Sequence, residues 1–206
     1  LDADVRAVSL ALTRLNMRDV DVYGHGYGAL VAARLAVKHP KRVRKVILDS
    51  PPHPSRSGWA TARRLAASTV PAPWSLDVPY FQEHGSRFQP EVIDHALGVA
   101  MTVGMTRVRR DLLPVVQQLH FDHRLRAEIM NAMGEFDASR DFAELNKPAL
   151  LLYGDHPPLD AQGVAWRDAM VQENSAVRLR RLANAGAMPM VEQPLRARDL
   201  VSDFLD

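Results

Sequence analysis

The sequence contains no cysteine among its 206 residues, and it lacks any long hydrophobic run. The absence of cysteine excludes disulfide scaffolds, cysteine-ligated metal sites and a cysteine nucleophile. No apolar run approaches the roughly 18 residues of a membrane-spanning helix, so we expect a soluble chain with no membrane partner. Its 14 prolines and 11 glycines are too scattered for a low-complexity chain. The length suits one core, or a core with an inserted subdomain.

An excess of charge of one sign is also missing. Lys and Arg total 26 against 24 Asp and Glu, a net charge of +2. The basic residues form short groups interleaved with apolar residues: Arg63, Arg64, Arg107, Arg109, Arg110, Arg178, Arg180 and Arg181. This spacing is typical of a solvated face rather than of a nucleic-acid footprint, so no nucleic-acid partner is expected.

Metal-ligand spacing occurs at one place, where His120 and His123 are three residues apart. A zinc site on a helix uses such a pair but needs a third ligand, and no third ligand follows a clear pattern here. We therefore expect no metal and no cofactor. The chain begins at Leu1 without a signal-peptide pattern, so we expect an upstream piece to be missing. The compartment stays open, with the cytoplasm as the working expectation.

The first quarter of the chain alternates helix and strand patterns. Asp2 and Asp4 can cap a helix, and the spacing of Val5, Val8, Leu12 and Leu15 predicts one buried face. Residues 20–23 follow as a short strand, 29–37 as a helix that is apolar nearly all round, and 46–48 as a second apolar strand. Strand, helix and strand with short joints predict parallel strands.

The same alternation returns late in the chain. Residues 149–153 and 176–182 read as strands, 161–172 as a helix, and 191–205 as a terminal helix carrying Leu195, Val201, Phe204 and Leu205. Residues 53–146 show helix periodicities broken by Pro and Gly, with no convincing strand. We interpret 1–52 and 147–206 as one core, and 53–146 as an inserted helical cap or lid.

Between the first strand and the apolar helix stands Gly24-His25-Gly26-Tyr27-Gly28, a glycine-rich turn in the pattern of a nucleophile elbow. This stretch resembles the α/β-hydrolase superfamily, in particular its lid-containing esterase, epoxide-hydrolase and C–C-hydrolase-like branch. Residues 38–48, 151–155 and 184–194 resemble the family's later passages in the right order. The resemblance implies an α/β fold, with a mainly parallel sheet, helices on both faces and a helical lid.

The same resemblance locates three positions that carry the family's chemistry. The nucleophile position is occupied by Gly26, the acid position by Pro157 and the base position by Ala187. No histidine follows His156. The resemblance therefore implies a Ser/acid/His site that has lost all three side chains, and with them most of the acceleration that a triad supplies.

The order of elements implies that this chain holds about strands 5–8 of the family sheet, with the elbow strand at an open edge. Parallel strands require cover on both faces, and an exposed edge invites pairing. We expect a missing N-terminal segment, a second chain or a homodimer to cover that edge.

Three hypotheses about function follow. The first is a degenerate hydrolase-fold protein that binds a small apolar or mixed molecule between core and lid, with His25, Tyr27, Asp49, Asp155 and Met188 as polar or pocket residues. The second is an atypical enzyme of lyase, cyclase or cofactor-independent oxygenase type, or a hydrolase with little activity. The third is an interaction subunit that pairs through its open sheet edge.

Overall fold

The computed structural model describes residues 1–61, 118, 123–155 and 161–206. A four-stranded parallel sheet in the order β1-β2-β3-β4 forms the centre of this part of the chain. Its strands are β1 (Val20–His25), β2 (Val43–Asp49), β3 (Ala149–Gly154) and β4 (Val177–Leu182). The predicted parallel sheet, with the elbow strand at an edge, is confirmed.

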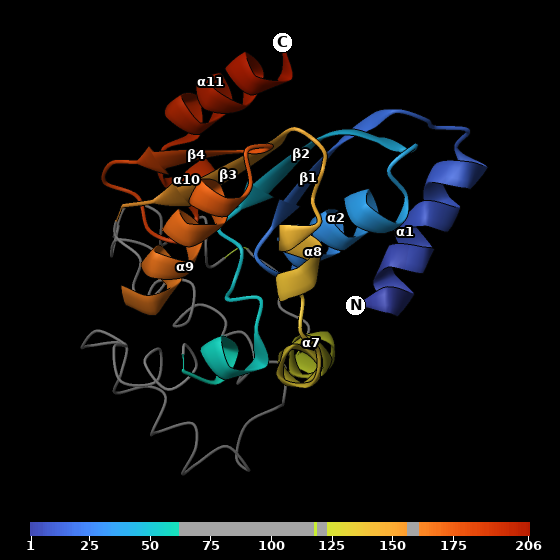
Figure 1. Cartoon of the computed structure of the whole chain (residues 1–206), viewed down its shortest axis with the longest axis horizontal. Helices are drawn as coiled ribbons and strands as arrows, with labels where there is room; N and C mark the ends of the chain where they lie inside the picture. Colours follow the sequence, from blue (N-terminus) through green and yellow to red (C-terminus); the bar gives the residue numbers. More distant parts are fainter. Residues whose placement is uncertain (62–117, 119–122, 156–160) are drawn as a thin grey trace.

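Helices flank this sheet on both sides (Figure 1). They are α1 (Asp2–Arg14), α2 (Tyr27–Lys38), α7 (His123–Glu135), α8 (Ser139–Ala143), α9 (Ala161–Glu173), α10 (Pro189–Glu192) and α11 (Pro194–Leu205). The continuous terminal helix predicted over 191–205 is wrong, because the chain breaks at Gln193, where φ is −137° and ψ is 57°. Pro194 forces this break, since a proline ring disfavours helical geometry in the preceding residue.

Strand alternation divides the core between the two faces of the sheet. On one face Val46, Leu48 and Leu151 are buried beneath α2, whose sheet-facing side is made of small residues such as Ala29 and Ala33. On the other face Ile47 and Leu150 pack against Phe204 of α11. Burying a leucine or valine side chain contributes about 1.5–3 kcal/mol to the stability of the fold. These contacts therefore supply much of the free energy that keeps β2 and β3 in the centre of the sheet.

Helix α1 differs from its sequence prediction in two ways. Val5 is 1% exposed, but Val8 is 36% exposed and Leu15 68%, so the predicted four-residue buried face is wrong at two positions. The predicted capping role is also wrong, because the N-cap of α1 is Leu1 and makes no side-chain hydrogen bond. Asp2 and Asp4 instead bond to side chains of α2, the helix against which α1 packs.

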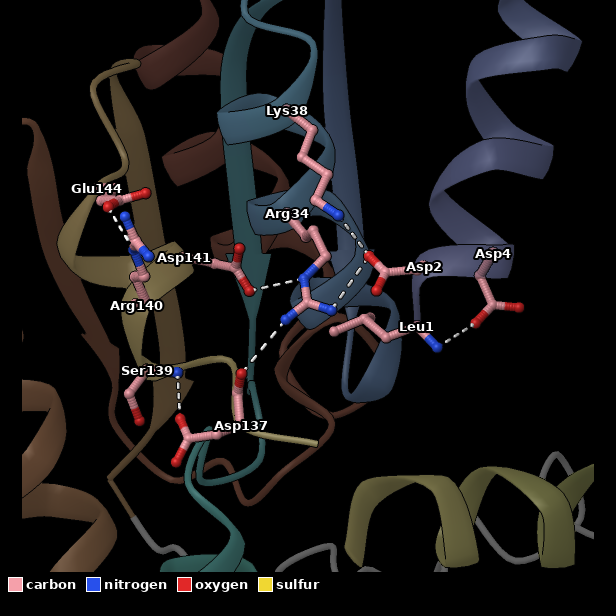
Figure 2. Close-up of polar contacts among 10 residues, drawn as sticks. All are labelled: Leu1, Asp2, Asp4, Arg34, Lys38, Asp137, Ser139, Arg140, Asp141 and Glu144. Carbon is pink, nitrogen blue, oxygen red and sulfur yellow. Dashed lines mark hydrogen bonds and ion pairs between the residues drawn. The ribbon is translucent and has the colours of Figure 1, made fainter. Parts of the chain in front are cut away.

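The two ends of the segment between β2 and β3 are held side by side against α2. Arg34 donates from Nε to Asp141 Oδ2 at 2.8 Å and from Nη2 to the carbonyl of Asp137 at 3.3 Å (Figure 2). The Ala138 amide donates to the Pro54 carbonyl at 2.9 Å. Burial raises the pKa of the Asp141 carboxyl, and the Arg34 guanidinium opposes that rise. The division into a core and an inserted lid stays a prediction.

Among the described residues, no helix is long and apolar enough to cross a membrane. The same residues contain no group of three or more His, Asp or Glu side chains that could hold a metal ion. His120 lies outside the described residues, and His123 is the first residue of α7.

Candidate functional site

The turn from β1 to α2 has the backbone of a sharp elbow. Gly26 stands between the strand and the helix with φ 54° and ψ −123°, a region that residues with side chains rarely adopt. Its amide donates to the Asp49 carbonyl at 2.9 Å, and its carbonyl accepts from the Ala29 amide at 3.0 Å. These bonds tie the turn to the end of β2 and to the first turn of α2.

Close backbone approach explains one of the flanking glycines. A Cβ added to Gly24 would lie 2.2 Å from the Gly28 carbonyl oxygen, which no real side chain tolerates. A Cβ added to Gly28 meets nothing within 4 Å among the described residues, and the same holds for Gly26. Steric contact therefore requires glycine at Gly24, whereas at Gly26 the positive φ would strain a residue with a side chain but no described atom would clash with it.

A buried carboxyl lies directly beside the elbow. Asp49 is 0% exposed and accepts hydrogen bonds from the Tyr23 hydroxyl and, at 2.9 Å, from the Ser50 hydroxyl. Burial raises the pKa of the Asp49 carboxyl, and the bond from Tyr23 opposes the rise. The pKa of Tyr23 is also raised, first by its own burial and then by Asp49. Both shifts therefore oppose the loss of a proton from either group.

His25 joins the elbow to the loop between β4 and α10, which the chain reaches 162 residues later. Its Nε2 donates to the Ala187 carbonyl at 2.9 Å, and the imidazole is exposed to solvent. His25 and Asp49 are register partners on β1 and β2, and a charged His25 lowers the pKa of Asp49. An imidazole, a buried carboxyl and a phenol therefore share the carboxyl ends of two parallel strands.

Two carboxylates hold the β4–α10 loop. Glu192 is 2% exposed, and its Oε2 accepts from the Gly186 amide at 2.7 Å and the Met188 amide at 3.4 Å. Asp155 accepts from the amide of Asn184, which has a φ of 62°, at 2.9 Å. These bonds fix the backbone on either side of Ala187.

The alpha/beta hydrolase family model matches residues 1–199 of the chain. The chain belongs to this family. Among proteins with curated descriptions, none matches the chain.

Several solved structures of hydrolases resemble this chain in fold. A proline iminopeptidase from Mycobacterium smegmatis is 18% identical, with 98% of this chain and 69% of that chain covered and a TM-score of 0.66. An enol-lactonase from Burkholderia xenovorans is 18% identical, with 98% and 71% covered and a TM-score of 0.69. A meta-cleavage product hydrolase from Pseudomonas fluorescens is 15% identical, with 99% and 71% covered and a TM-score of 0.64.

The residues that the sequence singled out do not all lie together in the structure. His25 contacts Ala187, and Asp49 lies under the elbow, but the Tyr27 hydroxyl points to α1 and donates to Asp4 at 2.6 Å. The pKa of Tyr27 is raised by burial and by Asp4. Met188 is the N-cap of α10. Pro157 lies outside the described residues.

Two functional candidates were missed in the sequence. The sequence patterns place Tyr23 only in a strand, and they place Glu192 only in the passage 184–194 and at the start of the predicted helix over 191–205. The strand alternation in Val20-Asp21-Val22-Tyr23 already places Tyr23 on one face with His25, and that signal could have singled it out. Nothing local points to Glu192, because its partners are backbone amides.

One small cavity lies away from the elbow, between β4 and α11. Its volume is about 80 Å³, and Leu150, Arg178, Arg180, Leu200, Asp203 and Phe204 line it. Ligand pockets usually measure about 300–1,000 Å³, so this hollow is too small to hold a substrate.

Proposed function

We propose that this alpha/beta hydrolase binds a small apolar or mixed molecule beside the elbow and does not use a Ser/acid/His mechanism. The observation that carries the proposal is Gly26. It keeps the positive φ of a nucleophile elbow but has no side chain, and the described residues leave open space where a Cβ would be. Ala187, on the loop that His25 contacts, has no group that accepts a proton.

Native mass spectrometry of the purified protein, compared with its denatured mass, tests ligand binding. A mass difference of a few hundred daltons that disappears on denaturation is the expected result. A protein that carries no such mass after purification, and gains none when incubated with a library of apolar acids, alcohols and esters, contradicts the proposal.

The missing mechanism is tested by Gly26→Ser, with Gly26→Ala as its matched control. Both substitutions strain the same positive φ, but only serine supplies a hydroxyl. We expect neither variant to hydrolyse 4-nitrophenyl acetate faster than the wild type, because Ala187, at the position of the family's base, has no group that can take the proton of the new hydroxyl. Turnover by Gly26→Ser alone would show that a base is present and that the proposal is wrong.

A second candidate, a non-hydrolytic acid–base enzyme, is favoured by the Asp49 cluster. A buried carboxyl that shares a proton with a phenol beside an exposed imidazole has the composition of a proton-transfer site. We expect any product formed from a ligand found by mass spectrometry to disappear in both His25→Ala and Asp49→Asn. Product formation that survives both changes excludes this candidate.

A further inference from the structure

Helix α11 crosses its face of the sheet obliquely. Near the start of the helix, Ala197 packs with Leu182, the last residue of β4. Near its end, Phe204 packs on Ile47 of β2, and Lys45 Nζ donates to the Phe204 carbonyl at 2.8 Å. Figure 1 shows α11 on the opposite side of the sheet from α2 and α9. The helix therefore moves from β4 towards β2 along its length, and the small cavity between β4 and α11 opens where the helix leaves β4.

Two arginines of β4 form the strand side of this cavity. Arg178 and Arg180 are two residues apart in the strand, so both side chains project from the face that α11 covers, with their Cα atoms about 6–7 Å apart. Leu150, 2% exposed, and Phe204, 8% exposed, provide an apolar floor. Asp203 lines the cavity from the helix. The lining therefore combines two cations, one carboxylate and an apolar floor, with an excess of one positive charge.

The charges of this cavity are not compensated by ion pairs within the described part of the chain. The next arginine of β4, Arg181, bonds to side chains on the other face of the sheet and forms an ion pair with Asp168 of α9. Among the described residues, none of Arg178, Arg180 and Asp203 forms an ion pair, and Arg180 donates to the carbonyl of the residue before it at 2.9 Å. The two guanidiniums therefore keep donors for an anion.

The size and the floor of the cavity favour a carboxylate with a short alkyl chain. A water molecule takes about 30 Å³ in the liquid and needs at least about 10–15 Å³ in a cavity, so the volume of about 80 Å³ has room for about three to five non-hydrogen atoms. Each guanidinium can donate charge-assisted hydrogen bonds to the same carboxylate. A sulfate or phosphate would instead place polar oxygens against the apolar floor and a second negative charge beside Asp203.

We propose that the cavity between β4 and α11 binds a short-chain monocarboxylate of the size of propionate. Its two oxygens accept hydrogen bonds from the guanidiniums of Arg178 and Arg180. Its alkyl chain lies against Leu150 and Phe204, and Asp203 disfavours anions of higher charge. The site is distinct from the elbow, because the elbow begins α2 on the other face of the sheet. This proposal therefore does not depend on the function proposed for the elbow.

The first test is an NMR titration of the ¹⁵N-labelled full chain with sodium propionate at constant ionic strength. We expect the Nε–H signals of Arg178 and Arg180 to shift and to saturate with a dissociation constant of about 1–10 mM. Propionamide, which has a similar shape without the charge, and sodium sulfate should each bind at least about fivefold more weakly. Shifts that grow without saturation, or binding of either control as tight as that of propionate, overturn the proposal.

Three single variants separate this site from the general positive charge of the chain. Arg178→Gln and Arg180→Gln each remove one guanidinium from the cavity and should weaken propionate binding at least about fivefold. Arg198→Gln is the matched control, because it removes the same charge from α11 outside the cavity lining. It should weaken binding by less than about twofold, since salt screens exposed charges. An equal loss in the control and in the two cavity variants overturns the proposal.

Asp203→Asn tests the helix side of the cavity, with Asp206→Asn as its control at the end of α11. Loss of the Asp203 carboxylate should strengthen the binding of sulfate by a larger factor than that of propionate, because a dianion is repelled more strongly by the same charge. Asp206→Asn should change neither dissociation constant by more than about twofold. If Asp203→Asn leaves the ratio of the two constants unchanged, the assigned role of Asp203 and the proposal with it are overturned.

The source of the carboxylate is tested with the peptide acetyl-Gly-Glu-Gly-amide, whose glutamate side chain ends in a propionate group. The walls of a small cavity exclude the peptide backbone, so we expect the peptide to bind at least about threefold more weakly than propionate. Binding as tight as that of propionate would assign the site to an acidic side chain of another protein, and the proposal of a free monocarboxylate would be overturned.

Discussion

The β1–α2 elbow and the β4–α10 loop are held in place by different kinds of contact. The elbow is fixed by backbone against backbone, with Gly24 against the Gly28 carbonyl and the Gly26 amide on the Asp49 carbonyl. The loop is fixed by the side chains of Glu192 and Asp155, which accept its amides. Steric contacts do not respond to pH or charge, whereas carboxylate contacts do. Different substitutions should therefore destabilise the elbow and the β4–α10 loop.

Gly24→Ala should produce the largest effect. Its Cβ would meet backbone atoms that cannot move without breaking the turn, so we expect a loss of about 3 kcal/mol or more in the free energy of unfolding. Urea unfolding followed by tryptophan fluorescence measures it. A loss below about 1 kcal/mol would show that the elbow relaxes, and that steric contact does not fix it.

Glu192→Ala should have the second largest effect. We expect it to lower the free energy of unfolding by about 1.5–3 kcal/mol, because it leaves the buried Gly186 amide without its charged acceptor. Glu192→Gln keeps an acceptor oxygen, so it should lower the free energy of unfolding by less than half as much. The comparison is by urea unfolding at neutral pH. If the two variants are equally destabilised, the carboxylate charge, and not the hydrogen bond, holds the loop.

Asp49→Asn tests the carboxyl beneath the elbow through the pH dependence of stability. The pKa of Asp49 is raised in the folded state, so its protonated form stabilises the fold below the unfolded pKa, and that stability is lost as pH rises through the folded pKa. Relative to the wild type, the Asn variant should therefore gain stability as pH increases from about 4 towards 8. Unfolding curves at several pH values measure the difference.

Because burial also raises the pKa of Asp141, Asp141→Asn is measured beside Asp49→Asn to separate the two contributions. A stability difference between the Asp49→Asn variant and wild type that is independent of pH would mean that the Asp49 carboxyl has the same pKa in the folded and unfolded states.

Gly28→Ala should have the smallest effect and serves as the control for Gly24→Ala. Its Cβ meets nothing within 4 Å among the described residues, and alanine favours a helix over glycine by about 1 kcal/mol. We expect unchanged or slightly raised stability by the same urea measurement. Strong destabilisation would reveal a contact from the rest of the chain.

The sequence predicted the local elements and the turn because both depend on neighbouring residues. Apolar runs at 46–48 and 149–153 predict buried strands, and the glycines at 24, 26 and 28 predict the elbow between β1 and α2. The break before Pro194 was missed, although the restriction that proline places on its predecessor is local.

The candidate site was predictable only in part, because its contacts join distant residues. The bond from His25 to Ala187 spans 162 positions. Tyr23 reaches Asp49 because the register pairs Tyr23 with Ile47 and His25 with Asp49, which puts both side chains on one face of the sheet. The side-chain pattern of either strand alone does not show which residues of the two strands are paired.

By itself, the sequence determined the order of strands and helices, and it placed Gly26 at the elbow and Ala187 in the late loop. These follow from residue identity and short-range geometry. Only the tertiary structure decided that Val5 is buried while Val8 and Leu15 are exposed, and that burial raises the pKa of the Asp49 carboxyl. Burial and pKa depend on which neighbours exclude water, and those neighbours come from other parts of the chain.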